Sequence, residues 1–157
     1  MTSEIIINEL NTCEVDVYAN LINEVFDEFV GKDYADKGKE TFKDFINPKN
    51  ALERYNSKNS VCYVARYKSE IIGILEIRSN NHISLFFVKS EFHGKGIGKK
   101  LWKHFLDKIK KENIEVDKVT VNSSIFAENI YARLGFVKTH ELQESDGIKF
   151  IKMECKV

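Results

Sequence analysis

Proline and cysteine are scarce in this chain of 157 residues, and long apolar runs are missing. A single proline argues against a long structureless linker. The three cysteines, Cys13, Cys62 and Cys155, form no C-x-x-C pair, which argues against a disulfide scaffold or a zinc module. No window approaches about eighteen consecutive apolar residues, so we expect no transmembrane helix and no membrane partner.

The chain also lacks the features of a secreted protein. Its first ten residues, MTSEIIINEL, do not show the basic-then-apolar layout of a signal peptide. With the odd number of cysteines, this predicts a reduced, cytoplasmic protein. Apolar residues make up 43% of the chain and charged residues 31%, so we expect a single packed domain over residues 1–157.

Net charge is zero overall, but the charges are unevenly distributed along the chain. Residues 1–60 carry twelve acidic and seven basic side chains, a net charge of −5. Residues 89–112 carry eight lysines against three acids, a net charge of +5. The positive charge is therefore concentrated in one short segment, and the acidic excess lies in the first third of the chain.

The spacing of apolar residues predicts a mixed α+β order rather than a regular βαβ alternation. We expect strands over residues 4–10, 60–67, 70–78, 82–88 and 118–122, helices that begin near Thr12, Pro48, Gly96 and Ser124, and a final hairpin around Asp146-Gly147. The three strands between residues 60 and 88 should form an antiparallel meander. Residues 31–59 are the least readable stretch, apart from the helix start at Asn47-Pro48.

The most informative segment is the glycine-rich turn that joins the strand ending at Val88 to the helix after Gly96. Glycines allow close backbone approach, and the first N–H groups of a helix lack intrahelical partners and lie at the positive end of its dipole. This combination favours a phosphate or pyrophosphate ligand. On glycine spacing alone, a solvated lysine-rich loop accounts for the pattern equally well.

Two motifs then point to one family. The run from His93 to Gly98, HGKGIG, resembles the [QR]-x-x-G-x-[GA] pyrophosphate loop of the GNAT superfamily of N-acetyltransferases. The segment from Ser124 through Tyr131 to Phe136 resembles that family's N-x-x-A-x-x-x-Y-x-x-x-G-F signature. The resemblance implies a GNAT-like fold, with a central, mostly antiparallel sheet of six or seven strands flanked by about four helices.

The resemblance also implies acetyl-CoA as the cofactor and direct transfer of its acetyl group to a primary amine. The residues expected to hold the cofactor are Phe87, Val88, His93, Gly94, Lys95, Gly96, Ile97, Gly98, Lys99, Ser124 and Tyr131. Two of these depart from the family pattern, since His93 replaces a glutamine or arginine and Ser124 replaces an asparagine. The backbone amides of the loop should provide most of the binding, so we expect weakened rather than lost affinity.

Three roles in the reaction follow from the resemblance. The backbone of Phe87 and Val88 should pair with the pantetheine amides like an added strand, with an N–H near Val88 facing the developing oxyanion. Tyr131 stands at the family's position for the acid that protonates the departing thiolate. The amine must also lose a proton, and from its place on the third predicted strand we take Glu76 as the first candidate for the base, or for a carboxylate that acts through water. A solvent-facing Glu76 is the alternative, and His82 is a weaker candidate. No pair of histidines has metal-ligand spacing, so we expect no metal.

The acceptor remains open at this stage. Its site should lie within residues 15–56, where the acidic excess favours a cationic amine of a small molecule or a protein. The alternative function is a non-catalytic acyl-CoA-binding module. Nucleic-acid binding ranks last, because the overall charge is zero and the lysine-rich helix lacks exposed aromatic residues. We expect a monomer or a homodimer.

Overall fold

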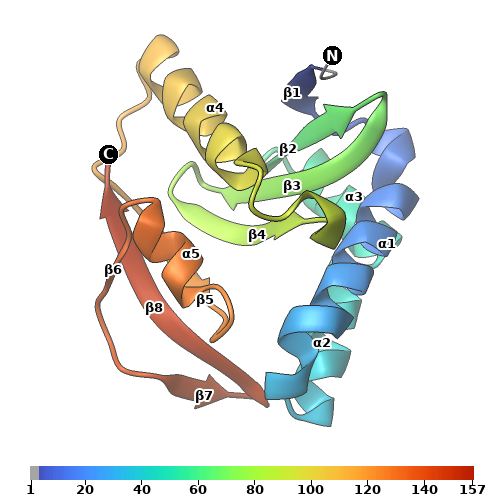
Figure 1. The fold of residues 1–157 in the computed structure, drawn as a ribbon, viewed down its shortest axis with the longest axis vertical. Helices are drawn as coiled ribbons and strands as arrows, with labels where there is room; N and C mark the ends of the chain where they lie inside the picture. Colours follow the sequence, from blue (N-terminus) through green and yellow to red (C-terminus); the bar gives the residue numbers. More distant parts are fainter. Residues whose placement is uncertain (1–3) are drawn as a thin grey trace.

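The computed structural model describes residues 4–157 and contains five helices on the two faces of an eight-stranded sheet (Figure 1). The helices are α1 (Val15–Val25), α2 (Asp36–Ile46), α3 (Pro48–Asn56), α4 (Ile97–Lys111) and α5 (Glu128–Arg133). The strands are β1 (Ile5–Glu9), β2 (Ser60–Tyr67), β3 (Glu70–Arg78), β4 (His82–Val88), β5 (Lys118–Ser123), β6 (Val137–Lys138), β7 (Gln143–Ser145) and β8 (Ile148–Lys156). None of the helices within residues 4–157 is long and apolar enough to cross a membrane.

The strand order is β1-β2-β3-β4-β5-β8-β6, with β7 paired to β8. All pairs are antiparallel except β4 with β5, so the predicted meander and the mostly antiparallel sheet are confirmed. The predicted turn at Asp146-Gly147 is also confirmed. Both of its residues have positive φ, 52° and 79°, as the tightest hairpin turns require.

Two features of the first half were not predicted. Helix α2 is largely polar, and only Gly38 and Ile46 are fully buried in it, so its apolar spacing is too sparse to show a helix. Helix α1 ends in a π-helical turn, Phe26–Val30. The wider π turn rotates the apolar stripe, so Val30 is buried and Phe29 remains only half-buried.

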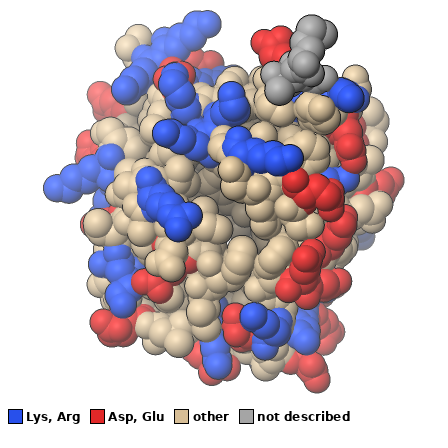
Figure 2. All heavy atoms as spheres, viewed as in Figure 1, with Lys and Arg blue, Asp and Glu red and all other residues tan. Residues whose placement is uncertain are grey.

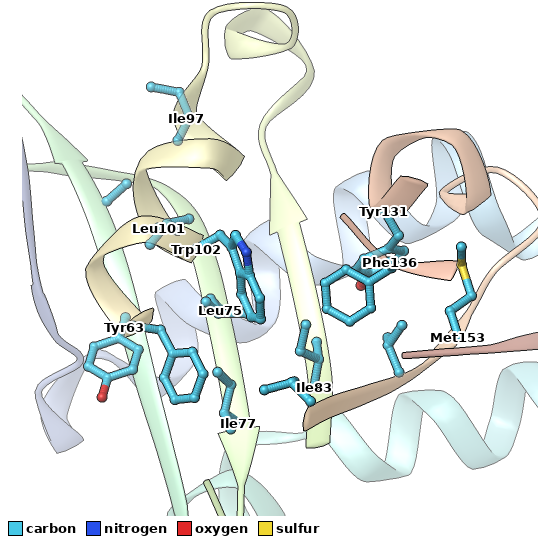
Figure 3. Close-up of a cluster of buried hydrophobic side chains, with 14 of the residues drawn as sticks. Tyr63, Leu75, Ile77, Ile83, Ile97, Leu101, Trp102, Tyr131, Phe136 and Met153 are labelled. Atoms are coloured by element: carbon cyan, nitrogen blue, oxygen red, sulfur yellow. The ribbon is translucent and has the colours of Figure 1, made fainter. Parts of the chain in front are cut away.

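Helices cover the sheet on both faces and produce two apolar clusters. Helix α4 packs on one face, where Trp102 meets Phe136 with ring centroids 5.1 Å apart (Figure 3). This contact ties the half of the sheet under α4 to the half that ends in β6. Helices α1 and α3 pack on the other face, where Tyr18, Ile22 and Phe26 are fully buried.

The pairing of β4 with β5 is short, and it positions the functional site. Only His82 with Thr120 and Ile83 with Val121 are in register, and the two strands diverge after this point. The His82 ring reinforces the pairing, with its Nδ1 2.7 Å from Thr120 Oγ1. Burial, and then the nearby Arg78 charge, lower the pKa of His82 to about 4, so the ring is neutral at pH 7.

We predict that His82 makes stability pH-dependent in a defined window. A histidine with a lowered folded pKa contributes stability above its unfolded pKa, near 6.5, and loses it as pH falls to about 4. His82→Asn should therefore remove about 1 kcal/mol of the loss in unfolding free energy that occurs as pH falls through this window. The effect is this small because the ring is only half-buried, so solvent screens part of it. Urea denaturation at several pH values measures the slope. The exposed-site control His140→Asn should retain the wild-type slope, and an unchanged slope in His82→Asn would contradict the assignment.

Candidate functional site

A cavity of about 620 Å³ occupies the space where β4 and β5 diverge. Its wall includes the edge of β4, the loop that precedes α4, the start of α5 and the chain around α1 and α2. Figure 2 shows a hollow of uncharged atoms at the centre of this face, with basic side chains gathered above it and acidic side chains along its right side. Most of the residues expected from the sequence line this cavity: Phe87, Val88, His93, Gly94, Gly96, Ile97, Gly98, Lys99, Ser124 and Tyr131.

The glycine-rich loop presents a row of unused backbone donors to the cavity. From Gly94 to Lys99, no backbone N–H donates a hydrogen bond to another residue within the described chain. Gly94 and Gly96 have φ of 74° and 78°, a conformation that strains other residues, and a Cβ at either would meet nothing within 4 Å. The loop is thus an open cradle of N–H groups at the positive end of a fifteen-residue helix, which suits a phosphate or pyrophosphate group.

Lysines add positive charge around this cradle. Lys99 lines the cavity, while Lys95 and Lys100 are exposed beside it and Lys95 lies over the Phe92 ring. No acidic residue stands in the first turn of α4. Of the residues expected to hold the cofactor, Lys95 is the one that does not line the cavity.

The edge of β4 corrects one expectation about the backbone. The Lys89 N–H donates to the Ile72 carbonyl at 2.8 Å, and the direction of backbone groups alternates along a strand. The N–H and carbonyl of Phe87 therefore face β3, whereas those of Phe86 and Val88 face the cavity. Phe87 lines the cavity with its ring only, and sequence reasoning missed that the backbone of Phe86 faces the cavity instead.

His93 contacts this same edge. Its Nε2 lies 2.7 Å from the Val88 carbonyl oxygen, and its ring lies 5.1 Å from the Phe29 ring. Phe29 in turn stacks on Phe126, with 4.9 Å between centroids. His93 thus occupies the Val88 carbonyl, which faces the cavity and would otherwise be open to a ligand. Its position in the sequence motif does not reveal this contact.

Tyr131 comes from α5 and is only 6% exposed. It lines the cavity, and the rings of Phe86 and Phe136 pack edge-on against it. Burial raises the pKa of Tyr131 well above its usual value, so the phenol remains protonated at neutral pH. A protonated hydroxyl in the cavity wall is able to donate a proton or a hydrogen bond.

Ser124 has a structural role as well as a place in the wall. Its Oγ accepts a hydrogen bond from the Ala127 N–H at 3.2 Å, at the turn that leads into α5. The hydroxyl therefore shapes the approach to Tyr131. One oxygen lone pair and the hydroxyl proton remain for a ligand.

Glu76 does not lie in the cavity, which corrects the expectation that it faces the acceptor. It is 1% exposed and sits beneath α1. The Tyr18 hydroxyl donates to Oε1 at 2.6 Å, and Arg54 Nε pairs with Oε2 at 2.9 Å. Both carboxylate oxygens are occupied, so this glutamate joins α1, α3 and β3 rather than taking a proton from a ligand. His82 likewise lies at the end of the β4–β5 pairing, outside the cavity wall.

Comparison with known proteins identifies the family. The family model described as acetyltransferase (GNAT) domain matches residues 30–157. The chain belongs to the GNAT acetyltransferase family. No curated protein sequence matches it significantly. The prediction of the family from two short motifs is thus confirmed, as is the GNAT fold.

Solved GNAT structures share this fold over almost the whole chain. A GCN5-related N-acetyltransferase from Rhodopseudomonas palustris superposes with a TM-score of 0.82 at 15% identity, covering 100% of this chain and 98% of the other. The PaiA N-acetyltransferase of Thermoplasma acidophilum, solved in complex with coenzyme A, has a TM-score of 0.78 at 21% identity, covering 98% and 99%. A GNAT acetyltransferase of Staphylococcus aureus has a TM-score of 0.74 at 19% identity, covering 98% and 99%. At these identities the likeness concerns the fold.

No cluster of three or more potential metal ligands occurs in the part of this GNAT domain that the structure describes.

The position of Glu76 gives a prediction on stability. Glu76→Ala should lower the free energy of unfolding by about 3 kcal/mol, because it leaves the Arg54 charge and the Tyr18 hydroxyl without a buried partner. Glu76→Gln should cost less, since its amide oxygen still accepts one of the two hydrogen bonds. The exposed neighbour on α3 provides the control, and Glu53→Ala should stay within about 0.5 kcal/mol of wild type. Denaturant titration measures all three. Unchanged stability with abolished acetyltransferase activity would instead make Glu76 the base.

Proposed function

We propose that this GNAT domain is an acetyl-CoA-dependent N-acetyltransferase that transfers the acetyl group directly to a primary amine of a small molecule or a protein. One observation supports this most strongly. The loop before α4 with its unused N–H groups, the free edge of β4 and Tyr131 all line one cavity. Anion binding, strand-like pairing and proton donation are the three abilities that the reaction requires.

The cavity wall offers partners for both the pyrophosphate and the pantetheine arm of coenzyme A. The N–H groups from Gly94 to Lys99 would hold the pyrophosphate, with Lys99 and the lysines nearby adding charge attraction. The backbone of Phe86 and Val88 would pair with the pantetheine amides as an added strand does. Once bound, the cofactor supplies an activated acetyl thioester. The complex of PaiA with coenzyme A, on the same fold, supports this assignment.

The protein groups have separate tasks in the transfer. The Val88 N–H faces the cavity and would donate a hydrogen bond to the carbonyl oxygen that gains negative charge. A new bond would form between the amine nitrogen and the acetyl carbon as the bond from that carbon to sulfur breaks. Tyr131 would give its proton to the departing sulfur, and its raised pKa keeps that proton in place until then. The nitrogen would then lose one proton, which restores the Tyr131 phenol.

Two departures from the family pattern support the binding module as a second candidate function. His93 already contacts the Val88 carbonyl, and the Ser124 hydroxyl already accepts a bond from the Ala127 N–H. Each would have to share or release its partner when a cofactor binds. A protein that binds acetyl-CoA but never transfers its acetyl group would be this alternative.

Tyr131→Phe tests the proposed reaction, and we expect it to lower kcat about 100-fold because the departing thiolate loses its acid. The affinity for acetyl-CoA, measured by calorimetry, should stay within a few-fold of wild type. In the wild type, kcat should not fall between about pH 7 and pH 10, because the raised pKa keeps the phenol protonated across that range. Thiol release with a panel of amines gives the rate.

Tyr63→Phe is the matched control, since Tyr63 is equally buried but packs beneath α4 outside the cavity. Its kcat should match the wild type. Equal rates for Tyr131→Phe and wild type would remove Tyr131 from the reaction. Binding of acetyl-CoA with no thiol release for any amine would support the binding module.

A further inference from the structure

The half of the cavity away from the glycine-rich loop is apolar and aromatic. We call it the acceptor end and define it by Val25, Val30, Tyr34, Phe42 and Phe87. The Phe42 ring lies 6.0 Å from Phe87 and 6.3 Å from Tyr34, measured between centroids. The Tyr34 hydroxyl is the one polar side-chain group among these five residues.

A buried ring supports this aromatic wall from behind. Phe26 is fully buried in the π-helical turn, stacks on Phe42 at 4.1 Å and meets Tyr34 edge-on at 5.1 Å. The rings of the acceptor end are therefore held in place before any ligand enters. A preformed wall of this kind favours a rigid, planar ligand, because aromatic pairs gain energy in stacked and edge-on geometries.

Within residues 4–157, the residues that line the cavity offer no carboxylate to a cationic ligand. Among the described residues that line it, none is aspartate or glutamate, and the ionisable basic side chains are Lys99, Arg133 and His93. The acids on the π-helical turn point outward, where Asp27 and Glu28 are exposed and Asp27 pairs with Lys43 at 2.7 Å. The acidic excess of residues 1–60 thus does not reach the cavity, and a cationic acceptor loses the support that this excess gave it.

A backbone contact joins the chain beside the acceptor end to the β7–β8 turn. The Ala35 N–H, next to Tyr34, donates to the Gly147 carbonyl at 2.9 Å. A Cβ at Gly38 would lie only 2.3 Å from that same carbonyl oxygen, so the two backbones are in direct contact. The start of α2 is therefore fixed against this turn, where β7 and β8 reach the helical segments at the bottom of Figure 1. A cavity of about 620 Å³ that also has to hold part of a cofactor suits a small acceptor rather than a protein chain.

Building on the proposed function, we propose that the acceptor is a small amine carried on an apolar, planar body, such as an arylalkylamine, and that it binds as the neutral amine. The apolar wall disfavours an ammonium group and so selects the uncharged form. A neutral amine already has the lone pair that attacks the acetyl carbon. The cavity wall therefore needs no carboxylate to deprotonate an ammonium group before the attack, in agreement with the burial of Glu76 elsewhere. The proton that the nitrogen loses after the attack would return to the Tyr131 oxygen.

The test compares 2-phenylethylamine with 1,4-diaminobutane and a lysine peptide, each with saturating acetyl-CoA. We expect kcat/KM for 2-phenylethylamine to exceed both others by at least about tenfold. Its kcat/KM should also rise with pH until the free amine is neutral. Equal or greater kcat/KM for the diamine or the peptide would overturn the inference while leaving the proposed function intact.

Two substitutions on α2 test whether the Phe42 ring is responsible for the preference for 2-phenylethylamine. Phe42→Ala should lower kcat/KM for 2-phenylethylamine about tenfold or more, with unchanged affinity for acetyl-CoA. Phe45→Ala is the matched control, because Phe45 is half-buried on the same helix but stacks on Arg54 outside the cavity. Its kcat/KM should match the wild type. Equal losses in both variants would contradict the assignment.

Calorimetry separates this inference from the proposed function. If acetyl-CoA does not bind, the proposed function fails, and binding of 2-phenylethylamine to the free protein still tests the acceptor end. If acetyl-CoA binds but no amine reacts, 2-phenylethylamine is titrated into the protein saturated with coenzyme A. Binding that Phe42→Ala weakens supports the aromatic acceptor end, and absence of binding overturns it.

Discussion

The site depends on the brevity of one strand pairing. Strands β4 and β5 are in register at only two positions and then diverge, so the β4 edge from Ser84 to Val88 has no strand partner on that side. Unpaired backbone groups need other partners, and the divergence supplies both those groups and the cavity that a ligand would fill. The two halves of the sheet do not separate further, because Trp102 packs against Phe136 and the His82 ring contacts Thr120.

Polar groups divide between two places with different functions. The Tyr18–Glu76–Arg54 cluster is buried under α1 and links three elements through a fully occupied carboxylate. The cavity wall, by contrast, offers donors without partners: the backbone N–H groups from Gly94 to Lys99 and the cavity-facing edge of β4. Satisfied groups hold the fold, and unsatisfied ones are available to a ligand. The acceptor end follows a third pattern, in which apolar rings select a ligand by shape and lack of charge.

Much of this architecture could be predicted from the sequence because it is local. Short β-branched and aromatic runs, separated by turn-like residues, located β2, β3 and β4, and the glycine spacing located the loop before α4. Strand register and the π-helical turn depend on tertiary packing, so the direction of the Phe87 backbone and the face of Glu76 were predicted wrongly. The charge of residues 1–60 could be counted, but the direction in which Asp27 and Glu28 point could not. For the same reason the apolar acceptor end left no contiguous signal, because its residues come from α1, the π-helical turn, the chain before α2, α2 itself and β4.

The most direct test of this site is an amide correlation spectrum of the isotope-labelled protein, titrated with coenzyme A. The largest shifts should fall on the N–H groups from Gly94 to Lys99 and on those of Phe86 and Val88. The Phe87 N–H, which faces β3, should shift less than either neighbour. Binding of coenzyme A that leaves these amides unmoved, with shifts instead along the lysine-rich end of α4, would contradict it.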